Sequence, residues 1–175
     1  LTIDLDIQQF AEQAFQRVHA LVDAVHQRGH FGVVAALAQG FGEQAHGVQR
    51  LAQARRIDCY SVGAASTFMA SELQSRLFRL GCTANAIFDA HQQLVSASTL
   101  GPDGVAFVIS HVGRMPFLLE SVTFARQQGA KVIAITQPHT PLADIADVVI
   151  DVMVRPDAVM RVGTEAYIAH LLVIE

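Results

Sequence analysis

Residues 55–67 of the chain read RRIDCYSVGAAST, and this stretch contains a complete strand-to-helix turn. The run Ile57–Val62 is short, mostly apolar and rich in residue types that favour strands. Gly63 and the small residues after it lead into a helix expected over Thr67–Leu80, and Gly81 follows where a helix often ends. This is the first unit of an alternating strand and helix pattern.

The same alternation continues to the end of the chain. Further apolar runs predict strands at Ala84–Phe88, Val105–Ser110, Lys131–Thr136 and Val148–Val152. Helices are expected over Pro116–Gln128 and Gly163–Ile174, and Asp89 with His91 is expected to cap a helix after the second strand. Because nearly continuous apolar strands separated by helices are typical of parallel sheets covered on both faces, the pattern predicts a doubly wound α/β fold.

Residues 1–54 have a helical pattern instead. Apolar residues recur there every three or four positions, at Ile7, Phe10, Ala14, Val18, Leu21 and Val25. We therefore divide the chain into an N-terminal helical segment at 1–54, which packs on the domain or forms a dimer contact, and an α/β domain at 55–175. The chain begins at Leu1 rather than Met, so we also expect a further domain upstream.

Composition narrows the function further. The chain has 175 residues, of which 51% are hydrophobic and 16% charged, and its net charge is −4. A single domain with a large core fits these values, and a basic surface for nucleic acid does not. The apolar richness and the N-terminal stripe predict a homodimer. Cys59 and Cys82 form no C-x-x-C pair, and no apolar run is long enough to span a membrane, so we expect a cytoplasmic protein with reduced thiols.

Two turns carry the residues expected to bind a ligand, because ligands of open parallel sheets bind beyond the carboxyl ends of the strands. Glycines allow a ligand to approach the backbone, while hydroxyls and the free amides of a helix start donate to an anion. An arginine adds a charge-assisted contact. The candidate ligand-binding residues are Ser61, Gly63, Ser66 and Thr67 in the first turn, Ser110, His111, Gly113 and Arg114 in the second, and Thr136 at the end of the fourth strand.

Several longer stretches of the chain match the sequence pattern of a known family. They are residues 54–57 (ARRI), 62–64 (VGA), 76–81 (RLFRLG), 109–111 (ISH) with Gly113-Arg114, 141–147 (PLADIAD), and 168–171 (IAHL) with Val173-Ile174. On these residues the chain from about Ala54 to Glu175 resembles the sugar-isomerase (SIS) phosphosugar-binding domain, specifically that of RpiR-like bacterial transcription regulators. The resemblance implies a five-stranded parallel sheet in the order 2-1-3-4-5 and a dimer. It also implies a phosphorylated sugar or sugar acid as effector, and DNA binding only through an upstream helix-turn-helix domain.

The chain departs from the family pattern at several positions. Ser61 stands where the family has its first glycine, and Ser66 is the equivalent of the family's serine only after a shift of one residue. Val112 and Met115 occupy positions where hydroxyls are expected, and Ala166-Tyr167 replaces Ser-Arg. With fewer hydroxyl donors in the second turn, we expect Arg114 to supply the main charge for the anion.

We therefore expect an effector-sensing domain of a regulator of carbohydrate metabolism, with no enzyme activity and no cofactor. One alternative is a phosphosugar isomerase, with Glu72, His111 and Glu165 as the acid–base candidates. The other is a degenerate SIS fold that serves only dimerisation. His19, His26 and His30 are spaced near helical repeats, but no carboxylate completes a ligand set, so no metal is expected.

Overall fold

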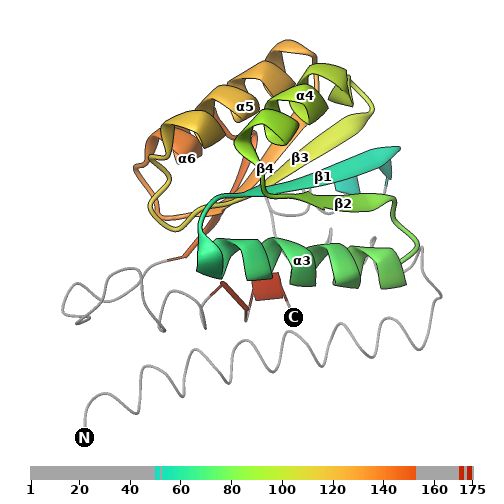
Figure 1. Ribbon diagram of the computed structural model, residues 1–175, viewed down its shortest axis with the longest axis horizontal. Coiled ribbons are helices and arrows are strands. Elements are labelled where there is room, and N and C mark those ends of the chain that lie inside the picture. The colour runs from blue at the N-terminus through green and yellow to red at the C-terminus, as the bar shows by residue number, and fades with distance from the viewer. Residues whose placement is uncertain (1–49, 52, 153–169, 172, 175) are drawn as a thin grey trace, which may run out of the picture.

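The computed structural model describes residues 50–51, 53–152, 170–171 and 173–174, and its centre is a five-stranded sheet (Figure 1). The strands are β1 (Arg56–Ser61), β2 (Ala84–Ile87), β3 (Gly104–Ile109), β4 (Lys131–Thr136) and β5 (Val148–Asp151). All neighbours are parallel, and their order is β2-β1-β3-β4-β5. The predicted fold class and strand order are confirmed, and no strand boundary differs from its expected position by more than one residue.

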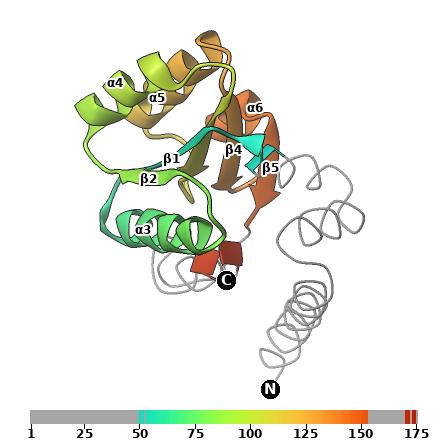
Figure 2. The ribbon, with the colours of Figure 1, turned by 90° about the vertical axis from the view of Figure 1, so that its right-hand side faces the viewer.

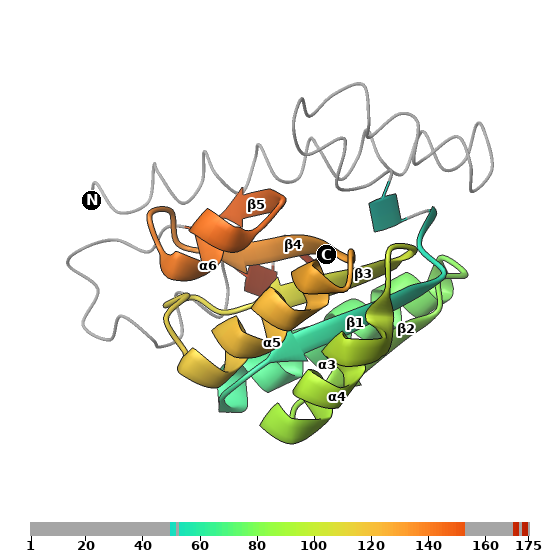
Figure 3. The same ribbon diagram turned by 90° about the horizontal axis from the view of Figure 1, so that it is seen from above.

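Helices cover both faces of this sheet (Figure 2). One layer contains α3 (Ala64–Arg79), and residues 170–171 and 173–174 lie beside it. The other contains α4 (Ala90–Leu100) and α5 (Pro116–Gln127), with the short α6 (Pro141–Ile145) next to α5. Seen from above, α4, α5 and α6 lie across the near face of the strands (Figure 3). The structure is therefore a three-layer, doubly wound α/β domain.

Local sequence signals explain where the helices begin and end. Gly63, with φ 98°, precedes α3, and Gly81, with φ 80°, follows its C-cap. The carboxylate of Asp89 accepts a hydrogen bond from the Gln92 amide (2.9 Å), which confirms Asp89 as a cap of α4, whereas His91 lies exposed within the first turn of the helix. Helix α3 begins three residues earlier than expected, because Ala64-Ala65 continue directly from the glycine and alanine is the best helix former.

The two faces of the sheet build two separate cores. Ile57 and Cys59 of β1 pack towards α3, whereas Tyr60 packs towards α4 and α5. All six residues of β3 are buried, because this strand is central and covered on both faces. Such strands lack the alternation of a half-exposed strand, which is why the sequence shows Val105–Ile109 as an unbroken apolar run.

Some expectations fall outside the described residues, namely the N-terminal helical segment, the three histidines within it, and most of the helix expected over Gly163–Ile174. The five-residue helix α6 was not anticipated. Its N-cap is Thr140, whose hydroxyl accepts a hydrogen bond from the Ala143 amide (3.2 Å), and Pro141 is its first residue. Within the described ranges, no helix is both long enough and apolar enough to cross a membrane.

Candidate ligand-binding site

The carboxyl ends of three neighbouring strands bring the predicted residues to one edge of the sheet. Ser61 of β1 is in register with Ile109 of β3, and Ile109 is in register with Ile135 of β4. The first turn, the second turn and the end of β4 therefore lie side by side. This edge is where ligands bind in open α/β sheets.

The first turn is shaped by Gly63. Its carbonyl accepts hydrogen bonds from the Thr67 amide (2.9 Å) and from the Thr67 hydroxyl (2.8 Å), so that hydroxyl is engaged within the helix. Ser66 is half-buried, and the side chain of Ser61 is completely buried. Neither α3 nor α5, both wholly described, carries an acidic residue in its first turn. The positive end of each helix dipole is therefore not neutralised by its own side chains.

The second turn is closed by Gly113. Its amide donates to the Ser110 hydroxyl oxygen (3.2 Å), and its carbonyl accepts from the Leu142 amide (3.1 Å). Gly113 has φ 60°, and a Cβ atom placed there would lie 2.5 Å from Oγ1 of Thr136 and 2.7 Å from Cβ of Thr140. Glycine is therefore required both by the backbone conformation and by the packing beneath it.

Two threonines support this glycine from below. Thr136 is completely buried, and its Oγ1 lies 3.3 Å from Oγ1 of Thr140. Thr140 also donates to the Gln137 carbonyl (3.0 Å). The observed contacts of Thr136 hold the loop of Gly113, and its role as a ligand contact stays a prediction. Thr140 was not selected from the sequence, although a threonine followed by proline is a recognisable helix start.

Arg114 lies at the surface between two loops. Its guanidinium Nη2 donates to the His139 carbonyl at 3.4 Å, which links the second turn to the loop after β4. His139 is in the left-handed region, with φ 58°. Helix α5 begins only two residues after Arg114, so this residue is a near neighbour in sequence of the positive end of the helix.

His111 is buried and belongs to a group of three residues. Nε2 of the Gln137 amide lies 2.8 Å from Nε2 of His111, and the His111 and His170 rings meet edge to face with centroids 5.4 Å apart. Burial lowers the pKa of His111. Burial, and then the proximity of His111, lower the pKa of His170 to about 4. Both rings are therefore neutral at physiological pH. Neither Gln137 nor His170 was selected as a site residue from the sequence, since the contact joins distant segments.

Gln93 of α4 is another residue that the sequence did not reveal. It is completely buried, and its side-chain Nε2 donates to the carbonyls of Ser61 (2.8 Å) and Ile87 (2.7 Å). These carbonyls lie at the carboxyl ends of β1 and β2, where the sheet ladder stops. The amide side chain thus holds the two strand ends together beneath the first turn.

Of the acid–base candidates for the isomerase alternative, His111 lies at this edge, whereas Glu72 is engaged further along α3. Oε1 of Glu72 lies 2.8 Å from Nε of Arg76, one turn further along α3. This is an ordinary ion pair along a helix. Glu165 lies outside the described residues. No group of three or more His, Cys, Asp or Glu side chains that could hold a metal ion occurs in the described part of the chain.

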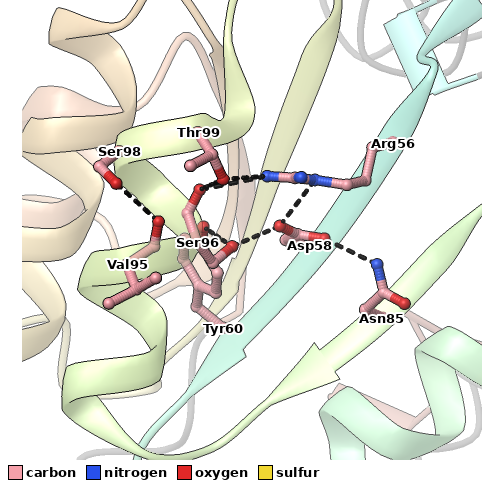
Figure 4. Close-up of polar contacts among 8 residues, drawn as sticks. All are labelled: Arg56, Asp58, Tyr60, Asn85, Val95, Ser96, Ser98 and Thr99. Carbon is pink, nitrogen blue, oxygen red and sulfur yellow. Dashed lines mark hydrogen bonds and ion pairs between the residues drawn. The ribbon is translucent and has the colours of Figure 1, made fainter.

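A second polar cluster lies at the opposite, amino end of β1 (Figure 4). The carboxylate of Asp58 is buried, lies 3.1 Å from Nε of Arg56, and accepts hydrogen bonds from the Asn85 amide (3.0 Å) and the Ser96 hydroxyl. Arg56 also donates to Thr99 of α4 (3.1 Å). An open pocket of about 180 Å³ adjoins these residues. Its polar groups bond to one another, and they attach α4 to the sheet.

The two cysteines have no part in either cluster. Both are free thiols; Cys59 lies in the core towards α3, and Cys82 is half-buried after that helix. Burial raises the pKa of Cys59 to about 12, with a smaller contribution from Asp58, and burial also raises the pKa of Cys82. A protonated thiol is a poor nucleophile, so neither residue has the properties of a reactive cysteine.

The fold and this edge define a class: doubly wound α/β domains with two small-residue turns at adjacent carboxyl strand ends. The family model of the SIS domain matches residues 50–175. The chain therefore belongs to the SIS domain family.

Two curated relatives and one solved structure illustrate the range of this family. The chain is 37% identical over 128 residues to the bifunctional protein glk of Burkholderia orbicola, covering 73% of this chain and 20% of that protein. It is 37% identical over 99 residues to the HTH-type transcriptional regulator RpiR of Escherichia coli K12, covering 56% of this chain and 33% of the regulator. The Vibrio vulnificus NanR protein, complexed with ManNAc-6P, superimposes with a TM-score of 0.68 at 23% identity, covering 99% of this chain and 62% of NanR.

These matches confirm the resemblance to SIS domains of the RpiR type. The chain spans only a fifth to a third of the length of the two curated relatives. The likeness to NanR, at its low identity, is a likeness of fold.

Proposed function

We propose that this domain senses a phosphorylated sugar or sugar acid for a cytoplasmic transcription regulator of carbohydrate metabolism and has no enzyme activity of its own. In this proposal residues 55–175 bind the effector, and residues 1–54 form helices that contact the domain or its homodimer partner. DNA is bound by a helix-turn-helix domain further upstream. Effector binding shifts the dimer between two arrangements, as in any ligand-driven population shift.

One observation carries the proposal. The glycine turn at Gly113 is packed tightly on Thr136 and Thr140, so its backbone is rigid, and it faces a second glycine turn at Gly63 across adjacent strand ends. Helices α3 and α5 start from these turns without acidic side chains, and Arg114 lies beside the start of α5. Rigid donors and unneutralised helix starts suit an anion such as a phosphate.

Calorimetric titration with a panel of sugar phosphates tests this proposal, with inorganic phosphate as the simplest probe. In an Arg114→Ala variant we expect binding of any phosphorylated ligand to weaken about ten- to a hundredfold, since a charge-assisted hydrogen bond contributes roughly 1.5–3 kcal/mol. Arg126→Ala, at the other end of α5, is the matched control and should bind normally.

Two results would overturn parts of the proposal. If no sugar phosphate and no phosphate binds the wild-type chain, the domain serves dimerisation instead. If Arg114→Ala binds as tightly as the wild type, the anion lies elsewhere on the molecule. Incubation with aldose and ketose phosphates, followed by NMR, should show no turnover; conversion that is lost in Glu72→Gln would favour the isomerase.

A further inference from the structure

Three buried polar side chains lie behind the two turns, on the α3 face of the sheet. Ile109 packs into the core beneath α3, and Ser61, its partner in register, continues the alternation of Ile57 and Cys59 on that face. His111 follows two residues after Ile109. The chain between them stays paired with β4, because the Ser110 amide donates to the Ile135 carbonyl (3.1 Å). The His111 side chain therefore shares this face.

His170 reaches the same place from the C-terminal end of the chain. Its ring lies against that of His111, and Ile174, one turn further along, belongs to the core cluster beneath α3. Ser61, His111 and His170 are 0%, 5% and 3% exposed, respectively. Three polar side chains next to the two turns are thus buried.

Each of these side chains has an atom without a hydrogen-bond partner among the described residues: Oγ of Ser61, Nδ1 of His111 and Nε2 of His170. Since an amide nitrogen only donates, the Gln137 amide makes Nε2 of His111 an acceptor and leaves the ring proton on Nδ1. The group therefore offers a donor at His111, and groups at Ser61 and His170 that can donate or accept. Buried polar atoms are normally satisfied, so these three atoms indicate a ligand subsite.

The chemistry of this group suits hydroxyls and opposes carboxylates. A hydroxyl both donates and accepts, so it can bond a donor and an acceptor that face it together. A carboxylate would be a buried charge among neutral groups, with no cation to pair with it unless a histidine became protonated. The proton would then be buried against the second ring, and burial already lowers the pKa of both histidines.

We infer that Ser61, His111 and His170 form a subsite for the uncharged hydroxyl groups of the effector, so that the domain selects phosphorylated neutral sugars over phosphorylated sugar acids. This inference rests on the proposed function, in which the phosphate lies against the turns at Gly63 and Gly113. His111 belongs to the same turn as Gly113, so a ligand anchored there by its phosphate has its sugar carbons next to the imidazoles.

Matched pairs of ligands test the selection. Calorimetry would compare glucose 6-phosphate with 6-phosphogluconate, and arabinose 5-phosphate with 5-phosphoarabinonate, beside inorganic phosphate. In any pair whose sugar binds, we expect the acid to bind at least about tenfold more weakly, which is the loss of roughly one hydrogen bond. A His170→Phe variant keeps a ring of similar size. It should lose about tenfold in affinity for the sugar phosphate and bind inorganic phosphate as the wild type does.

The controls separate this inference from the proposed function. His91→Phe, at an exposed position of α4, should change neither affinity. If His170→Phe does not fold, His170→Gln and Ser61→Ala give the same comparison with smaller changes of shape. Equal affinity for acid and sugar overturns the inference alone, as does a sugar affinity that survives these substitutions. Absence of binding by every sugar phosphate and by phosphate overturns the proposed function and the inference with it.

Discussion

Replacing Gly113 with alanine tests the packing at the centre of the candidate site. The new Cβ would lie 2.5 Å from Oγ1 of Thr136 and 2.7 Å from Cβ of Thr140, and both threonines are buried. Neither can rotate away without losing its hydrogen bonds, since Thr140 caps α6 and donates to the Gln137 carbonyl. The substitution therefore has to move the turn, the threonines, or both.

The expected loss of stability has two parts. An alanine at φ 60° costs roughly 1–2 kcal/mol in conformational strain, and about 0.4–1 kcal/mol is recovered because the unfolded chain is less flexible. Overpacking against the threonines adds about 1–3 kcal/mol. We expect Gly113→Ala to lower the free energy of unfolding by about 3 kcal/mol, which is about 6–12 °C in Tm for a chain of this size.

Gly81→Ala is the matched control. Gly81 also has a positive φ, 80°, but no atom lies within 4 Å of its hypothetical Cβ, so only the strain applies. Its expected loss is about 1 kcal/mol. Urea unfolding of both variants, followed by circular dichroism, measures the difference. If Gly113→Ala and Gly81→Ala lose the same stability, the threonines do not pack against the turn and the rigidity argued for the site is wrong.

Two further predictions concern buried polar groups. In urea unfolding, Gln93→Leu should lower the free energy of unfolding by about 2–4 kcal/mol, because the Ser61 and Ile87 carbonyls lose their buried donor. Gln92→Leu, at an exposed position of the same helix, should change the free energy of unfolding by less than about 0.5 kcal/mol. Equal effects of the two substitutions would contradict the contact between Gln93 and the strand ends. Because burial lowers the pKa of His170 from 6.5 to about 4, the unfolded state binds the proton first, so stability is full above about pH 6.5 and falls as the pH approaches 4. The loss attributable to this group is at most about 3 kcal/mol, and a His170→Phe variant with an unchanged pH slope would show that another group is responsible.

The sequence predicted the strands well for a physical reason. Parallel strands covered on both faces are apolar along their whole length, so runs such as Val105–Ile109 mark them without any knowledge of neighbours. The same rule explains why the buried ion pair of Asp58 was not predicted from the sequence. Asp58 lies within a run taken as apolar, and its buried carboxylate is balanced by Arg56, Asn85 and Ser96 from the same strand, the next strand and a helix.

The candidate site was predictable only in part. Turn chemistry identified Gly63 and Gly113, since small residues after a strand can be recognised locally. The residues that hold those turns come from elsewhere in the chain: Thr140 lies after another strand, and Gln93 in another helix. Such partners depend on strand order and register. The family resemblance supplied the strand order, but local patterns do not show which side chains of distant segments meet.

Helix α4 is fixed to the sheet at two separated points. Gln93 bonds the carboxyl ends of β1 and β2, while Ser96 and Thr99 bond Asp58 and Arg56 towards the amino end of β1. A helix held at two points can neither slide along its axis nor rotate without breaking one set of bonds. We therefore expect the α4 layer to act as the stationary frame when an effector binds. The conformational change would then occur in the opposite layer, where His170 contacts His111 of the second turn. Side chains in that layer meet mainly through apolar contacts, which are not directional and allow small shifts.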